Sequence, residues 1–255
     1  MRLTTAIIDK RYLVGFASLG AGLVLWDVYA RTLGDPVFIP TIPDIAGAFV
    51  DLVGDQEFWS SYATTLEPFL IGWLTALVVG IPFGLLMGRS RVVTGLTMPE
   101  LSFVSALPIS TIVPVVVILF GIDLVARSTV VFLFAIVEIV FTTASGVRYI
   151  DKDLYDMGDT FGLSRLKRFT RITLPGATAG IAAAIRVGTG RAVVGMVVME
   201  LLLVSVGVGR LISRYKDAFE ASRLYAVVLS LAIFALAVQA ILRSLERRAL
   251  KWRGA

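Results

Sequence analysis

Four charged side chains lie within long apolar stretches of this 255-residue sequence: Glu138, Arg186, Arg191 and Glu200. An ionised group in hydrocarbon costs at least a few kcal/mol, so such groups face other protein segments or a watery cavity. One interpretation is a polar translocation path in which the arginines meet an anionic solute. The other is structural, with Arg191 pairing with Glu138 or Glu200 to hold helices together and Arg186 reaching the membrane interface. The structural interpretation is favoured.

Hydroxyl groups accompany a proline in one of these stretches. Ser105 and Ser110 flank Pro108, and irregular backbone inside a membrane survives only against protein or water. The two serines therefore belong to the candidate path, although hydroxyls also serve helix packing.

Side chains that catalyse reactions or bind metals are scarce. Histidine and cysteine are absent, which removes the commonest general base and the commonest metal ligands. There is no HExxH motif and no intramembrane carboxylate pair, so we expect no catalytic residue and no metal site. None of the five lysines follows a glycine, so a Walker A loop is missing and this chain is expected to bind no cofactor.

The composition is that of an integral membrane protein. Hydrophobic residues make up 57% and charged residues 17%, against about 45–50% and about 25% in soluble domains. Runs such as 113–120 are apolar on every side, which favours helices over barrel strands. A bilayer core about 30 Å thick needs roughly 20 helical residues. The sequence thus predicts an all-α fold, one transmembrane domain over residues 1–255 with spans at about 12–30, 69–87, 101–122, 128–147, 176–204 and 224–242.

The distribution of basic residues predicts the orientation. Sixteen of the Lys and Arg residues fall on the side of the two termini, six on the other side and two inside a span. By the positive-inside rule both termini are cytoplasmic. The basic pI of about 9.7 follows from this topology and requires no nucleic-acid partner. The first apolar segment is interpreted as a retained helix rather than a signal peptide, because its uncharged run is long for one.

Two connections carry further helix signals. In the outer loop 31–67, Pro43 and Asp44 resemble a helix start, and we expect a short helix on the membrane surface, with Phe58 and Trp59 at the interface. In the cytoplasmic loop 151–175, acidic residues gather at the start of a helical stretch.

The loop 151–175 predicts two short amphipathic helices joined at a turn. Leu154, Gly158 and Phe161 fall on one face of the first helix. Gly162 permits a positive φ, Ser164 can cap the second helix, and Pro175 interrupts it. Lipid headgroups would repel the acidic first helix, so a protein partner is the better cover for its apolar face.

This loop resembles the signature of permease subunits of bacterial ABC importers. The family pattern is Glu-Ala-Ala, three residues, Gly, nine residues and Ile-x-Leu-Pro. Here Asp156-Met157-Gly158 replaces the opening triplet, and Gly162 and Ile172-Thr173-Leu174-Pro175 follow in register. The likeness extends over nearly the whole chain and is closest to the sulfonate, taurine and nitrate branch, through Phe38-Ile39-Pro40, Gly80-Ile81-Pro82, Leu107-Pro108, Phe120-Gly121-Ile122 and Gly207-Val208-Gly209.

The resemblance implies a type I importer permease of six helices in the bacterial inner membrane. It implies a second permease copy, a dimer of ABC ATPase subunits that holds ATP and Mg, an extracytoplasmic solute-binding protein, and surrounding lipid. It also implies that the ATPase docks on the coupling residues Asp156, Met157, Gly158, Phe161, Gly162, Leu163, Leu174 and Pro175.

Two other classes of function compete with this one. A self-sufficient secondary transporter would need inverted repeats and a mid-membrane ion site, and we find no convincing repeat and only one isolated mid-span acid, Glu138. A membrane-embedded enzyme would need a catalytic group, and none is evident.

Overall fold

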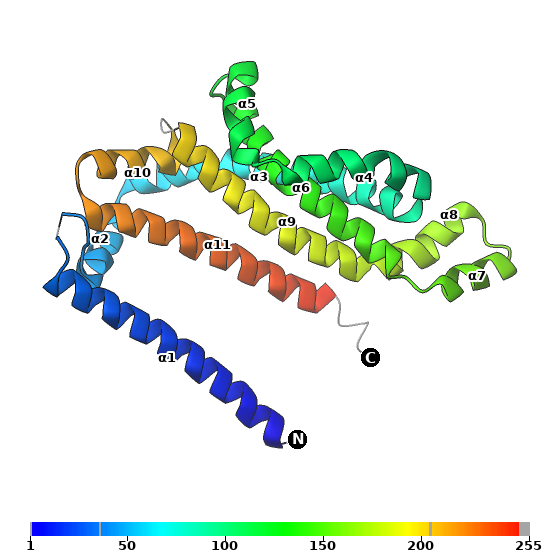
Figure 1. The fold of residues 1–255 in the computed structure, drawn as a ribbon, viewed down its shortest axis with the longest axis horizontal. Helices are drawn as coiled ribbons and strands as arrows, with labels where there is room; N and C mark the ends of the chain where they lie inside the picture. Colours follow the sequence, from blue (N-terminus) through cyan, green and yellow to red (C-terminus); the bar gives the residue numbers. More distant parts are fainter. Residues whose placement is uncertain (1, 36, 204–205, 250–255) are drawn as a thin grey trace. The chain divides into compact units, whose positions relative to one another are not determined.

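The computed structural model describes residues 2–35, 37–203 and 206–249, and the secondary structure of this part is entirely helical (Figure 1). The chain divides into two compact units: residues 1–61 with 210–232, and residues 62–209 with 233–255. The helices in chain order are α1 (Arg2–Thr32), α2 (Ile42–Gly54), α3 (Gln56–Arg89), α4 (Arg91–Ala106), η1 (Ile109–Ile112), α5 (Val113–Phe120), α6 (Leu124–Arg148), α7 (Lys152–Thr160), α8 (Arg165–Arg168), the π-helical turn η2 (Phe169–Thr173), α9 (Leu174–Leu203), α10 (Gly207–Asp217) and α11 (Ala221–Ala249).

In the first unit, polar contacts near the end of α1 fix the connection to α2. The Asp27 carboxylate accepts a hydrogen bond from the backbone N–H of Ile42 at 3.0 Å, and Trp26 donates its indole N–H to the carbonyl of Pro40 at 3.0 Å. Thr41 and Asp44 form a reciprocal capping box at the start of α2, which satisfies backbone donors that a helix start leaves free. The predicted helix in loop 31–67 is therefore confirmed.

The second unit is built around α6, which packs along α9. Gly146 of α6 faces Gly180 of α9 so closely that a side chain on either would overlap the other's Cα atom. Gly84 of α3 lies in the same way against Thr143 of α6. Small residues at these crossings let the helix backbones approach, which is how helices associate where both water and a hydrophobic driving force are missing.

Four helices in the described part are long and apolar enough to cross a membrane: α3, α6, the continuous helix through α8, η2 and α9, and α11. The bent pair α4 with η1–α5 adds a fifth if it forms one span. The predicted span 12–30 falls within α1, and the last residue of the span 176–204 lies outside the described residues. Several spans are confirmed, and the total of six stays a prediction.

The span predicted at 101–122 is bent. α4 ends at Ala106, and η1 and α5 continue at an angle of 87° to it. The cause is Pro108: the residue before a proline is pushed out of the helical region, and Leu107 is extended at φ −73° and ψ 137°.

Two further differences concern the connections. Residues 56–68 belong to α3, so Phe58 and Trp59 lie on a helix that continues into the span rather than in a loop. Helix α10 was not expected, because its mixture of glycine, basic and apolar residues has no long apolar run.

Candidate functional site

The loop 151–175 forms a compact helical hairpin. Helix α7 ends in a Schellman motif, in which Leu163 N–H donates to the carbonyl of Gly158 at 2.9 Å and Gly162 N–H donates to that of Asp159 at 3.0 Å. Gly162 has φ +66°, as the sequence predicts. Ser164 caps α8 through the backbone N–H of Lys167. The turn is thereby fixed by its own backbone and side chains.

Contacts across the hairpin hold α7 against the chain that returns toward α9. Asp159 forms an ion pair with Arg168, and the Tyr155 hydroxyl lies 3.1 Å from the hydroxyl of Thr173. Gly158 is buried. A Cβ atom added to it would lie only 2.9 Å from the Cδ1 atom of Ile172. These contacts join α7 to α8 and η2, which lead directly into α9.

The exposed apolar face of α7 differs in one residue from the prediction. Leu154, Met157 and Phe161 are 46%, 55% and 78% exposed. Gly158 instead faces Ile172 of η2, on the inner side of the hairpin. The physical reason is that absence of a side chain lets η2 approach the helix at this position. The outward face is thus carried by residues spaced at i, i+3 and i+7, which is one side of a helix.

Pro175 does not interrupt the helix, which corrects a second expectation. η2 is a π-helical turn in which Leu174 N–H donates to the carbonyl of Phe169, five residues back. A proline ring clashes with the carbonyl four residues earlier in a regular α-helix, and the wider π turn removes that conflict. Leu174 and Pro175 accordingly lie in the first turn of α9.

The second candidate region centres on Arg191 of α9 and Glu138 of α6. Their side chains form an ion pair of 2.8 Å and remain 55% and 35% exposed. Both line a cavity of about 240 Å³ that also contains Ser105, Leu107 and Pro108 at the break after α4. Ser110 is exposed and does not line this cavity. Of the predicted path residues, three are therefore brought together.

The other two predicted path residues lie in separate ion pairs. Arg186 pairs with Glu246 of α11 at 2.8 Å, and its carbonyl accepts a hydrogen bond from the Gln239 side chain. Glu200 is 5% exposed and pairs with Arg127 at 2.6 Å. Glu200 is therefore the partner of Arg127 and not of Arg191.

Arg127 is one of the six basic residues that the sequence analysis counts outside the spans, but it is a buried residue of α6. Arg127 is 7% exposed in the first turn of α6, where it also donates to the carbonyl of Thr64 at 3.1 Å. Only three residues separate it from Asp123, the residue before α6, so in the sequence it looks like an ordinary charge at the end of a span. No local signal distinguishes it from an interfacial arginine.

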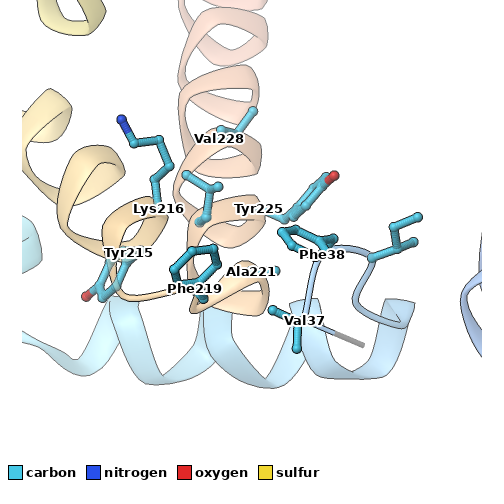
Figure 2. A pocket seen from close by; sticks show the side chains of 10 residues that line it. Val37, Phe38, Tyr215, Lys216, Phe219, Ala221, Tyr225 and Val228 are labelled. Carbon is cyan, nitrogen blue, oxygen red and sulfur yellow. The ribbon is translucent and has the colours of Figure 1, made fainter. Parts of the chain in front are cut away.

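Another cavity lies at the corner between α10 and α11, and residues 37–39 also line it (Figure 2). Its volume is about 520 Å³, and its walls are aromatic and aliphatic, with Lys216 as its one charged residue. Phe219, at φ +57°, contacts Phe38 edge to face at 6.2 Å. Burial raises the pKa of the neighbouring Tyr215 above its ordinary value. This cavity is mainly apolar, and among its lining residues only Tyr215, Lys216 and Tyr225 carry polar side-chain groups.

Comparisons with known proteins identify the family. The description "Binding-protein-dependent transport system inner membrane component" matches residues 80–251. The taurine transport system permease protein TauC of Escherichia coli is 26% identical, over 91% of this chain and 86% of its own length. The formylaminopyrimidine transport permease protein ThiX of Halalkalibacterium halodurans is 25% identical, over 91% and 92%.

The riboflavin transport system permease protein RibX of Chloroflexus aurantiacus is 26% identical, over 90% of this chain and 86% of its own length. The family match begins in the last third of α3 and runs through α11, and it includes the hairpin 151–175. The chain belongs to the family of inner membrane components of binding-protein-dependent transport systems, and it is a multi-pass permease subunit of an ABC importer.

Proposed function

We propose that this chain forms, with a second copy of itself, the translocation path of an ATP-driven importer for a small solute with a sulfonate-like anionic group. The similarity to TauC supports the solute class. The half-exposed guanidinium of Arg191 supports it too, because it borders the cavity at the α4 break and arginine binds planar and tetrahedral oxyanions through two N–H groups at once.

The observation that carries the proposal is the exposed apolar face of α7. Leu154, Met157 and Phe161 lie on a hairpin that is locked by the Schellman turn at Gly162 and by the Asp159–Arg168 ion pair. Such a face is covered when a partner groove receives it, as amphipathic helices do in helix-in-groove complexes. The partner is a dimer of ATPase subunits. The ATP and Mg are assigned to that partner because this sequence has no Walker A loop.

The remaining partners follow from the transport system. An extracytoplasmic solute-binding protein delivers the solute to the outer face, and both termini of the permease lie in the cytoplasm with the hairpin 151–175. The excess of sixteen basic residues over six supports this orientation.

Reconstitution separates this function from secondary transport. The permease is purified with its co-purifying ATPase, placed in vesicles with the solute-binding protein, and supplied with radiolabelled taurine. We expect uptake in the presence of ATP and no uptake with an ATP analogue whose γ-phosphate cannot be hydrolysed. Uptake driven by a proton or sodium gradient in the absence of ATP would instead identify a secondary transporter.

Two variants test the role of the Arg191–Glu138 pair. In Arg191→Gln we expect uptake to fall at least tenfold while ATPase association persists, since one anion contact is worth about 1.5–3 kcal/mol. The matched control is Arg223→Gln, which removes an exposed arginine that pairs with Glu220. If Arg191→Gln lowers the membrane level of the protein and not the uptake per molecule, the pair serves assembly and the path lies elsewhere.

A further inference from the structure

A third cavity, of about 520 Å³, opens where the turn between α3 and α4 meets the start of α7. Four basic side chains line it: Arg89, Arg91, Arg148 and Lys152. They form two pairs, one at the connection from α3 to α4 and one at the connection from α6 to α7, and the fold brings these two connections together. No carboxylate lines the cavity.

These four cations form no direct ion pair, although Asp151 and Asp153 flank Lys152 in the sequence. Among the described residues, no carboxylate lies within 4.0 Å of any of them. Arg148 donates instead to the hydroxyl of Thr94 at 3.3 Å, and Arg89 lies 4.8 Å from the ring centre of Tyr155. The arginines Arg127, Arg186 and Arg191 of the same unit each have a carboxylate partner.

The helix ends act on these four cations in opposite ways. Arg89 and Arg148 lie in the last turns of α3 and α6, where a cation is favoured by the helix dipole. Arg91 and Lys152 are the first residues of α4 and α7, where the dipole opposes a cation. Two cations placed against the dipole and beside two others are stabilised when an anion occupies the cavity.

We propose that this cavity binds an oxyanion, a phosphate or sulfonate group, through Arg89, Arg91, Arg148 and Lys152. Guanidinium groups bind such groups through paired N–H donors. The oxyanion belongs either to the headgroup of an anionic phospholipid or to a free small anion. Both present the same group to the arginines, and basic clusters at a membrane surface attract either.

An occupied cavity would restrain the coupling hairpin, a consequence that rests on the proposed function. Lys152 and Tyr155 are on α7, and the Tyr155 hydroxyl contacts Thr173 just before α9. The exposed residues Leu154, Met157 and Phe161 lie outside the cavity lining. A bound oxyanion therefore joins α7 to α4 and α6 from one side and leaves the other side open to a partner.

Binding is tested on the full-length purified chain without any transport measurement. The chain is placed in vesicles of phosphatidylcholine alone or with added phosphatidylglycerol, and is titrated with inorganic phosphate or methanesulfonate. The readout is acetylation of lysines by an amine reagent, followed by peptide mass spectrometry. We expect several-fold slower labelling of Lys152, with no change at Lys167, an exposed lysine of the same hairpin that lies outside the cavity.

The two sources give different patterns. Protection by phosphate or methanesulfonate in phosphatidylcholine vesicles identifies a free oxyanion. Protection by phosphatidylglycerol alone identifies a lipid headgroup. A labelling rate of Lys152 that is the same under every condition overturns the proposal. This measurement uses the unaltered protein, so it does not depend on a variant folding.

A paired set of variants provides the second measurement. In the double variant Arg91→Gln with Arg148→Gln, we expect the concentration of anion or lipid needed to protect Lys152 to rise at least tenfold. The matched control is Arg165→Gln with Arg243→Gln, which removes the same charge from exposed arginines outside the cavity. Equal protection in both double variants would contradict the assignment. Transport and ATPase association are not read out, so loss of the proposed function would leave this result unchanged.

Discussion

At the scale of single residues, the buried Glu200 links segments that are distant in the sequence. Its carboxylate accepts from Arg127 at 2.6 Å and from the backbone N–H of Gly209 at 2.8 Å. Thr65 accepts from the N–H of Val208 at 3.0 Å, and Gly207 has φ +65° where a side chain would overlap Thr65 and Glu200. One buried acid thus joins α9, α6 and the start of α10.

Removal of one partner of this pair is expected to leave a buried unpaired charge. We expect Arg127→Gln to lower the free energy of unfolding by about 3–5 kcal/mol, measured by denaturant titration in detergent. Arg127→Gln with Glu200→Gln should recover part of that loss, since neither charge is then left alone. Arg223→Gln, at an exposed pair with Glu220, is the control and should change stability by about 1 kcal/mol or less.

Arg127 also shows where sequence reasoning ends at this scale. Its partner Glu200 is 73 residues away, and neither residue stands in a pattern that points to the other. In contrast, the Arg191–Glu138 pair was one of two pairings foreseen. Apolar runs indicate that a buried charge needs a partner, but only the packing of α6 against α9 selects which one.

At the scale of elements, the hairpin 151–175 is the part best predicted from sequence. Acidic residues at its start, Gly162 and Ser164 each act through local backbone chemistry, and their effects appear where expected. Pro108 indicates irregular backbone, but the sequence predicts neither the 87° bend after Leu107 nor the burial of Gly158, because both depend on the packing of neighbouring segments. Hydropathy identifies an apolar segment and carries no information on its direction.

Substitution of Gly162 tests the hairpin as a coupling element. In Gly162→Val a β-branched side chain must adopt φ near +66°, which costs roughly 1 kcal/mol or more and disfavours the Schellman turn. We expect the six predicted spans to insert normally, while ATPase co-purification and ATP-dependent uptake fall several-fold. Gly47→Val is the control, because that glycine has no neighbour within 4 Å and an ordinary φ. Unchanged co-purification would remove the hairpin from this role.

The exposed face of α7 gives a second test at this scale. Phe161→Asp places a charge on a side chain that is 78% exposed, so the isolated permease should keep its stability. A groove that receives Phe161 would have to desolvate the carboxylate, which costs several kcal/mol without a partner. We expect co-purification of the ATPase to be lost in Phe161→Asp and retained in Tyr149→Asp, since Tyr149 is exposed but lies before the hairpin.

At the scale of the whole molecule, the topology depends on whether the bent pair of α4 and η1–α5 crosses the membrane. Arg89 and Arg91 stand at its beginning. At its other end the first basic residue is Arg127, which is ion-paired and buried rather than interfacial. This difference in charge between the two ends favours a crossing, whereas a re-entrant segment would return to the side on which it began.

The absence of cysteine in the chain lets single-cysteine variants locate each segment. If the bent pair crosses, three spans separate Gly54 from Thr160, and the two positions face opposite compartments. In spheroplasts we expect a membrane-impermeant maleimide to label Gly54→Cys directly and Thr160→Cys only after lysis, with the cysteine-free parent as the control. Both positions are exposed, so access of the reagent depends on the membrane alone. Labelling of both variants before lysis would mean that α4 and α5 return to the same side, and the positive-inside assignment of the hairpin would fail with it.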